Sequence, residues 1–130
     1  MFPAGGVREV EFLVVTNNPQ VKKKYNNLMM ISLEGSVEEL FDLVRDYIHR
    51  GHRLLTHPLS GSLKPGRIPY KTILISVTPA GLDPDSLRLI EGAIEACSKF
   101  ARNKCPQLPG QVLSDYAAVD LAHLEAALEN

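Results

Sequence analysis

Short apolar segments alternate with amphipathic segments along this chain. Four of the apolar runs have the length of strands, and each is bounded by polar or turn-forming residues. These runs comprise residues 12–15, 28–33, 53–56 and 72–77. The first run is apolar without alternation, which is typical of a strand that is covered on both faces. We therefore expect a sheet enclosed between helices.

The clearest helical pattern begins after Ser36. Ser36 and Glu39 have the spacing of a capping box, in which each side chain satisfies a backbone N–H at the start of the helix. Gly51 suits the left-handed position that ends a helix. The apolar stripe between them comprises Val37, Leu40, Phe41, Val44 and Ile48.

Three further helices are predicted from their caps and their apolar spacing. A short helix follows Asn18, and a long one runs from Asp83 to about Lys104, because each starts with a capping residue that precedes proline. The last helix is expected to be capped near Ser114 or Asp115, after a segment rich in proline.

The expected order of elements is β-α-β-α-β-loop-β-α-α. Apolar strands alternating with helices indicate one three-layer α/β domain over residues 9–130, resembling half of a Rossmann fold, with a mainly parallel sheet of about four strands and flanking helices. Residues 1–8 contain proline and glycine and are expected to form a flexible lead-in. The direction of the fourth strand stays open, because its connection is long enough for a crossover but has no helical pattern.

Composition narrows the class of protein. The length of 130 residues suits a single domain. The formal net charge of -1 argues against nucleic-acid binding. No apolar run approaches the roughly 20 residues that span a bilayer, and the start does not resemble a secretory signal. The two cysteines, Cys97 and Cys105, lack the C-x-x-C spacing of redox or zinc motifs. We expect a cytoplasmic protein with reduced thiols, no membrane contact and no cofactor.

Polar turns are expected at the carboxyl ends of the strands, where open α/β sheets bind ligands. Three of these turns, at residues 16–18, 34–36 and 56–62, should converge there. Helix N-termini at two of them favour negative charge. The competing explanation is structural, since helix caps and tight turns need the same residue types. The candidate ligand-binding residues are Thr16, Asn17, Asn18, Ser36, Thr56, His57, Ser60, Gly61, Ser62 and Lys71.

Charge is distributed unevenly along the chain. No carboxylate occurs between Tyr47 and Leu82, and a locally positive surface there would attract a phosphate, a carboxylate or an acidic partner. The alternative is that the acidic last helix covers this surface and neutralises it. Residues 22–24, three consecutive lysines, are interpreted as a solvated face. The cations of the carboxylate-free stretch are Arg50, Arg53, Lys64, Arg67 and Lys71.

His57 is the candidate catalytic residue, because its imidazole titrates near physiological pH and lies at the expected ligand edge. A histidine in a loop is also common as a hydrogen-bonding residue. His49, His52 and His57 are not expected to share a metal ion, because the strand between the last two is about 16 Å long. The phosphate-binding, dinucleotide-binding and nucleophile-elbow motifs are absent.

Several motifs together resemble the GrdX family, whose small proteins are associated with glycine reductase gene clusters in amino-acid fermentation. The motifs lie at residues 15–19, 33–36, 48–62 and 69–71, and the most distinctive is T-H-P-L-S-G-S at residues 56–62. The resemblance extends from about Leu13 to Phe100 and does not extend confidently to residues 105–130. It implies a cytoplasmic accessory role and carries no catalytic residue or cofactor onto this chain.

The resemblance and the polar turns together favour an accessory or regulatory protein of the glycine, sarcosine or betaine reductase system. Such a protein would bind a small anionic ligand or the reductase subunits. One alternative is a small enzyme that acts on a phosphorylated or acyl substrate, with His57 as the acid–base and Ser60 or Ser62 holding the anion. Another is a structural component that forms a homo-oligomer.

Overall fold

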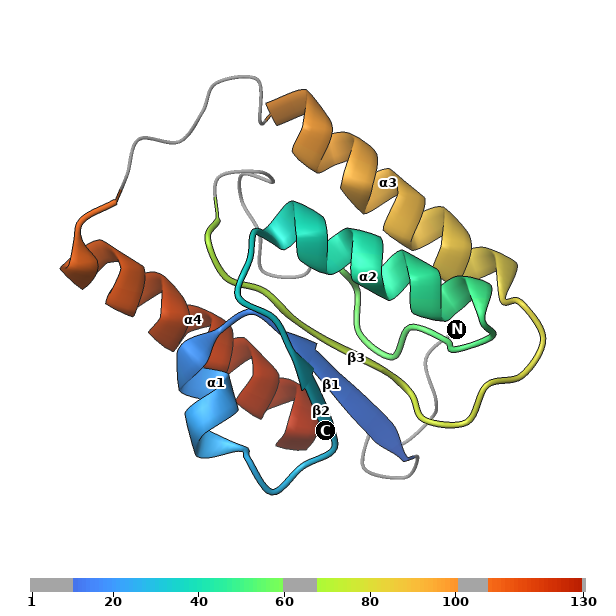
Figure 1. Cartoon of the computed structure of the whole chain (residues 1–130), viewed down its shortest axis with the longest axis horizontal. Coiled ribbons are helices and arrows are strands. Elements are labelled where there is room, and N and C mark those ends of the chain that lie inside the picture. The colour runs from blue at the N-terminus through green and yellow to red at the C-terminus, as the bar shows by residue number, and fades with distance from the viewer. Residues whose placement is uncertain (1–10, 60–67, 101–107, 130) are drawn as a thin grey trace.

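The computed structural model of the chain describes residues 11–59, 68–100 and 108–129 (Figure 1). The expected lead-in at residues 1–8, the candidates at residues 60–62 and Cys105 lie outside the described residues. The described chain is a mixed α/β protein, as its sequence predicts. Its elements are β1 (Phe12–Thr16), α1 (Pro19–Lys24), β2 (Met30–Ser32), α2 (Val37–His49), β3 (Thr72–Ser76), α3 (Pro84–Phe100) and α4 (Gly110–Glu129).

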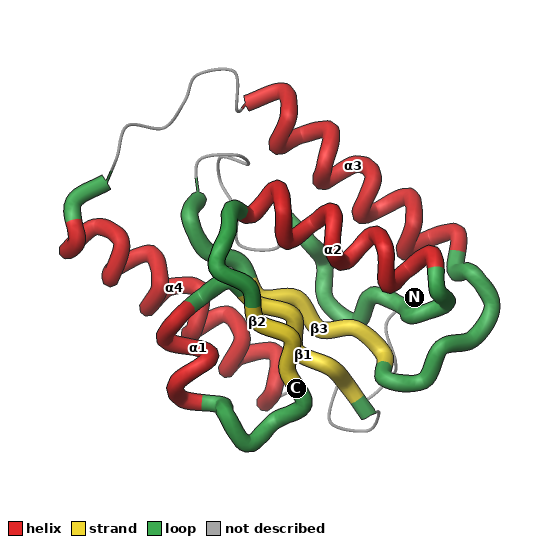
Figure 2. Tube along the Cα trace, viewed as in Figure 1, coloured by secondary structure: helices red, strands yellow, loops and turns green. Residues whose placement is uncertain are grey.

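The strands lie side by side in one small sheet (Figure 2), and their directions are mixed. β1 lies between the other two strands, in the order β2-β1-β3. It pairs in parallel with β2, where Val15 lies opposite Ile31, and antiparallel with β3, where Val15 lies opposite Ile73. The carboxyl ends of β1 and β2 and the start of β3 therefore meet at one edge of the sheet.

This sheet corrects part of the predicted fold class. The described residues form three strands rather than about four, and one of the two strand pairs is antiparallel, so the sheet is not mainly parallel. The direction of β3, which the sequence left open, is antiparallel to β1. The resemblance to half of a Rossmann fold is not confirmed.

The expected strand at residues 53–56 forms only an isolated bridge between Leu54 and Ile75. At the next position the N–H of Leu74 donates to the side chain of Thr56, at Oγ1 over 3.1 Å, and not to a backbone carbonyl. Pro58 follows, and it has no N–H with which to continue a ladder. The segment thus lies along β3 but ends before it becomes a fourth strand.

Helices cover both faces of the sheet (Figure 1). Because successive strand residues point to opposite faces, Val15 packs in one core with α2 and α3, and Val14 packs in a second core with α1 and α4. Full burial of each large aliphatic side chain contributes roughly 1.5–3 kcal/mol to the stability of the fold. The largest fully buried side chains of the first core are Leu40, Phe41, Ile48, Leu54, Ile73, Ile75 and Ile90.

Local sequence fixes both ends of α2 as predicted. Ser36 Oγ accepts from the N–H of Glu39 over 3.0 Å, and the Glu39 side chain accepts from the N–H of Ser36 over 3.2 Å. Gly51 ends the helix with φ of 105°. A Cβ at this position would lie 1.9 Å from the carbonyl oxygen of Ala80, so the turn requires glycine.

The start of α4 differs from the prediction of a cap near Ser114 or Asp115. The helix begins at Gly110, and the N–H of Leu113 donates to the carbonyl of Pro109 over 3.0 Å. A proline costs nothing at a helix start because the first N–H groups have no partner within the helix. Pro109 therefore lies at the start of the helix and does not interrupt it.

None of the helices in the described part of the chain combines the length and the apolar character needed to cross a bilayer.

Candidate functional site

Asn17 directly follows β1 and fastens two other segments to the end of this strand. Its Nδ2 group donates to the carbonyl oxygens of Gly35 and Pro69, each over 2.9 Å. Its Oδ1 atom accepts from the N–H of Lys71 over 2.8 Å. The turn before α2 and the segment that enters β3 thus meet at the carboxyl end of β1, and two of the three predicted turns converge.

Asn18, the next residue, makes its contacts with α1 and α4. Its Oδ1 atom accepts from the N–H of Gln20 over 2.9 Å, which caps α1 as predicted. Its Nδ2 group donates to the carbonyl of Ala117 and to Asp120 Oδ2, each over 2.9 Å. Asn18 is 1% exposed, so these bonds satisfy an amide that water does not reach.

Asp120 of α4 is the centre of a buried network beneath this strand end. Its carboxyl group accepts from the N–H of Thr72 over 3.1 Å and from the hydroxyl of Thr72 over 2.7 Å. Since the Thr72 proton is used there, the hydroxyl of Thr16, 2.7 Å away, donates to Thr72. Thr16 Oγ1 in turn accepts from the N–H of Asn18 over 3.0 Å. The network joins β1, β3 and α4.

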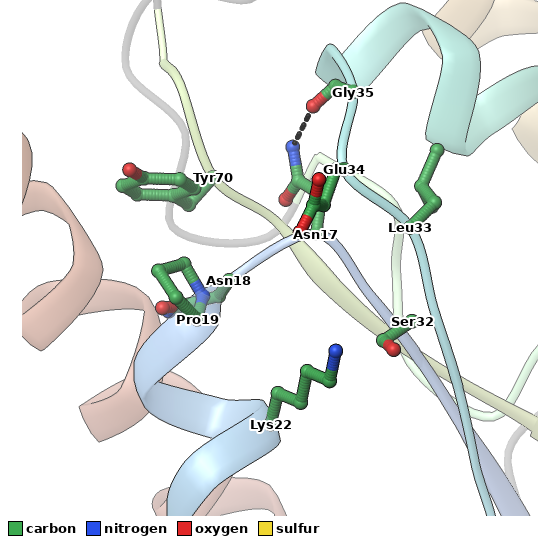
Figure 3. Close-up of a pocket in the computed structure, with 9 residues that line it drawn as sticks. All are labelled: Asn17, Asn18, Pro19, Lys22, Ser32, Leu33, Glu34, Gly35 and Tyr70. Atoms are coloured by element: carbon green, nitrogen blue, oxygen red, sulfur yellow. Dashed lines mark hydrogen bonds between the residues drawn. The ribbon is translucent and has the colours of Figure 1, made fainter.

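A pocket of about 370 Å³ opens at the carboxyl ends of β1 and β2 (Figure 3). Its walls come from the end of β1, from α1, from the end of β2 with the following turn, and from the residue before Lys71. This is where ligands gather in open α/β sheets. The residues that line it are Asn17, Asn18, Pro19, Lys22, Ser32, Leu33, Glu34, Gly35 and Tyr70.

Two opposite charges line this pocket. Lys22 extends from α1 toward the end of β2, and Glu34 lies in the turn after β2 (Figure 3). Within the described ranges, no ion pair or side-chain hydrogen bond engages Lys22 or Glu34. The amides of Asn17 and Asn18, by contrast, are already bonded to protein atoms. A ligand would therefore meet the charged side chains, and the asparagines hold the walls in place.

Lys71 is a buried lysine whose backbone N–H donates to the side chain of Asn17. Its side chain is nearly inaccessible, and its carbonyl accepts from the N–H of Asn17 over 3.4 Å. Burial lowers the pKa of Lys71 below its ordinary value of 10.5, and the negative charge of Asp120 opposes part of this shift. Lys71 is not among the residues that line the pocket.

The remaining candidate residues that the structure describes are not among the residues that line the pocket. Ser36 is occupied by its capping box, and Thr56 accepts the hydrogen bond from β3 described above. His57 is exposed, and its Nδ1 atom accepts from the N–H of Leu59 over 3.1 Å. Structural roles account for Ser36 and Thr56, and the candidates at residues 60–62 lie outside the described residues.

The acidic last helix pairs mainly with α1. Glu125 of α4 forms an ion pair with Lys24 and accepts a hydrogen bond from the hydroxyl of Tyr25 over 2.9 Å. The bonds from Lys24 and Tyr25 hold the pKa of Glu125 below its usual range. Among the residues that the structure describes, no ion pair joins α4 to Arg50 or Arg53.

Sequence reasoning missed three residues that matter at this strand end. Lys22 is exposed, as expected for a solvated lysine run, but its place in the pocket lining is not predicted, and Glu34 belongs to a predicted turn without being named as a candidate. Asp120 had a recognisable signal, because a carboxylate at this position interrupts the apolar face of α4 that carries Ala117, Leu121 and Leu124. A lone acidic residue on an apolar helix face indicates a buried polar partner.

No group of three or more histidine, cysteine or acidic side chains within the described ranges is placed to hold a metal ion. His52, which follows α2, is placed against other protein groups. His52 Nδ1 lies 2.6 Å from the carbonyl oxygen of Ser76, and its ring packs edge-on against Tyr47.

The structure defines a small mixed α/β protein with a pocket at the carboxyl ends of two parallel strands. The family model of GrdX-like proteins matches residues 13–129, which is nearly the whole chain. The chain therefore belongs to the GrdX-like family, and the match includes the C-terminal segment that the sequence resemblance did not cover. No curated protein matches the chain, and no solved structure matches it.

Proposed function

We propose that this protein is an accessory protein of the glycine reductase system that binds a small anionic ligand in the pocket between α1 and the turn after β2. Membership of the GrdX-like family supports the association with the reductase. The observation that carries the ligand is Lys22, a cation that lines the pocket and forms no ion pair with the described residues. Its natural counterpart is a carboxylate or a phosphate.

The geometry supports binding rather than turnover. The pocket walls are held by saturated hydrogen bonds of Asn17, and the candidate acid–base His57 is not among the lining residues. A pocket of about 370 Å³ is at the lower end of the range for small-molecule sites, which supports a compact ligand. The proposal includes contact with the reductase subunits in the cytoplasm.

Isothermal titration calorimetry with acetate, inorganic phosphate and acetyl phosphate tests the ligand. We expect saturable heat with at least one of these anions and a loss of about tenfold or more in affinity for Lys22→Gln. Lys23→Gln removes a neighbouring exposed lysine that does not line the pocket, and it should bind as the unaltered protein does. Equal losses in both variants would show that general charge, not the pocket, attracts the anion.

The reductase association is tested separately. Immobilised full-length protein is exposed to purified subunits of the reductase, and binding is followed by biolayer interferometry with an unrelated acidic protein as the control. We expect concentration-dependent binding of at least one subunit. Flat responses for every subunit, with and without the anions, would contradict the accessory role.

A further inference from the structure

The pocket presents a carboxylate as well as an ammonium group, and a simple anion would satisfy only one of them. We propose that its ligand is a small zwitterion, whose carboxylate meets Lys22 and whose ammonium meets Glu34. This inference rests on the proposed function, because it names the ligand class of the same pocket. The zwitterion proposal differs from the simple-anion proposal in what it predicts for Glu34, because a simple anion does not need this carboxylate.

The two charges face one pocket without neutralising each other. Lys22 and Glu34 come from different walls, and no ion pair joins them although both side chains are long (Figure 3). A ligand with one charge only would be attracted by one of these groups and repelled by the other. A ligand with both charges is attracted at both ends.

The backbone positions of both groups are fixed by the contacts around the end of β1. Lys22 is on α1, which Asn18 caps and which the fully buried Val21 anchors. Glu34 precedes Gly35, whose carbonyl is bonded to Asn17. The distance between the two walls is therefore set by protein hydrogen bonds before a ligand arrives, which reduces the entropy lost on binding.

The remaining lining residues suit the short body of such a ligand. Pro19, Leu33 and Tyr70 contribute apolar surface, and Ser32 contributes a hydroxyl that makes no side-chain hydrogen bond with the described residues. Lys22 and Glu34 are both exposed at their tips, so water weakens their attraction. We therefore expect modest affinity that falls as the salt concentration rises.

Calorimetry on the full chain at one ionic strength tests the inference. The zwitterion probes are glycine and 4-aminobutanoate, which differ in the spacing of their charges. The single-charge probes are acetate and methylammonium. We expect at least one zwitterion to bind about tenfold or more tightly than either single-charge probe, because only it contacts both groups.

Charge-removing variants locate the effect. Glu34→Gln should reduce the affinity for the zwitterion about tenfold and leave acetate binding unchanged or stronger, and Lys22→Gln should weaken both. The control is Glu38→Gln, which removes an exposed carboxylate of α2 that does not line the pocket, and it should bind every probe as the unaltered protein does. Circular dichroism confirms that each variant is folded.

The outcomes separate this inference from the function on which it rests. Suppose that acetate or phosphate binds as tightly as both zwitterions and that Glu34→Gln weakens the binding of none of them. The zwitterion proposal is then wrong, and the proposal that the pocket binds a simple anion is retained. If none of the anions or zwitterions produces saturable heat, both ligand proposals are wrong, and the reductase association is judged by its own experiment.

Discussion

The end of β1 separates two regions with opposite chemistry. On the side of α4, the carboxyl group of Asp120 is buried and accepts three hydrogen bonds from Asn18 and Thr72. On the side of the pocket, Lys22 and Glu34 are exposed and form no ion pair within the described residues. The first region holds the strand end to a helix, and the second leaves charge available to a ligand.

The comparison shows that the presence of polar residues does not by itself identify a binding site. Asn17 and Asn18 were the natural candidates because of their residue type and position, yet their amides are bonded to the protein. What distinguishes the pocket is that its charged side chains have no ion-pair or side-chain hydrogen-bond partner among the described residues. We expect substitutions in the first region to change stability and substitutions in the second to change binding.

The largest effect on stability is expected for Asp120→Ala. The change removes three hydrogen bonds: the buried amide of Asn18 keeps only its bond to the carbonyl of Ala117, and the hydroxyl and N–H of Thr72 lose their acceptor. Buried groups that lose such a partner cost about 1–3 kcal/mol each, so we expect a loss of about 3 kcal/mol in the free energy of unfolding. Urea denaturation followed by circular dichroism measures it.

The control for this variant is Asp115→Ala on an exposed position of the same helix, which should change stability by less than about 0.5 kcal/mol. Similar losses for Asp115 and Asp120 would mean that helix charge, and not the buried network, is responsible.

A smaller loss is expected for Asn17→Ala, about 2 kcal/mol, because three hydrogen bonds to backbone groups are removed from a side chain that is 7% exposed. The variant should also weaken ligand binding, since the turn that carries Glu34 loses its attachment. Differential scanning calorimetry and titration with the probes above measure the two effects. Asn26→Ala, in an exposed turn, should change neither.

Lys71→Met should have a still smaller effect on the free energy of unfolding, and this effect should depend on pH. Burial lowers the pKa of Lys71 in the folded protein, so the unfolded chain binds the proton more tightly. The cost of burying the charge is fully present below the folded pKa and disappears as the pH rises to the ordinary value of 10.5. The stability of the unaltered protein relative to Lys71→Met should therefore increase with pH in that window.

Urea midpoints of both proteins between neutral pH and pH 10.5 measure this difference. A difference that stays constant over the whole range, or that changes in the opposite direction, would show that burial does not lower the pKa of Lys71.

The smallest effect is expected for His57→Ala. His57 is exposed, does not line the pocket and accepts one local hydrogen bond from Leu59. Titration of the variant with the anions and zwitterions should give the affinities of the unaltered protein. Loss of binding would show that His57 contributes to the binding site, and it would favour the enzyme alternative.

Much of the fold could be predicted because local sequence determines it. The capping box at Ser36, the glycine at position 51 and the cap at Asn18 act within a few residues, and all three are confirmed. The strand expected at residues 53–56 was wrong, because the Thr56 side chain accepts from the N–H of Leu74 in β3 where a strand would use a backbone carbonyl, and this contact spans 18 residues of sequence. The start of α4 was misplaced because proline was interpreted as a break rather than as the first acceptor of the helix.

The site was harder to predict than the fold. The sequence predicted candidates at the sheet edge where the pocket lies, and two of them, Asn17 and Asn18, line this pocket. Whether a polar group is saturated depends on contacts with residues far away in the chain, such as Pro69 for Asn17 and Asp120 for Asn18. No local pattern reveals these contacts. For the same reason the sequence shows that Lys22 is an exposed charge but not that it lines a pocket.

The most direct test of the central claim is a titration of ¹⁵N-labelled protein with glycine and 4-aminobutanoate, followed by heteronuclear NMR. A zwitterion that bridges the two pocket walls should shift the amide signals of Lys22, Glu34, Gly35 and Tyr70, and the signals of Arg53 and His57 should stay in place. Acetate at the same concentration should produce smaller shifts near Lys22 alone. Shifts that are absent from both walls, or that are centred on His57, would contradict the account.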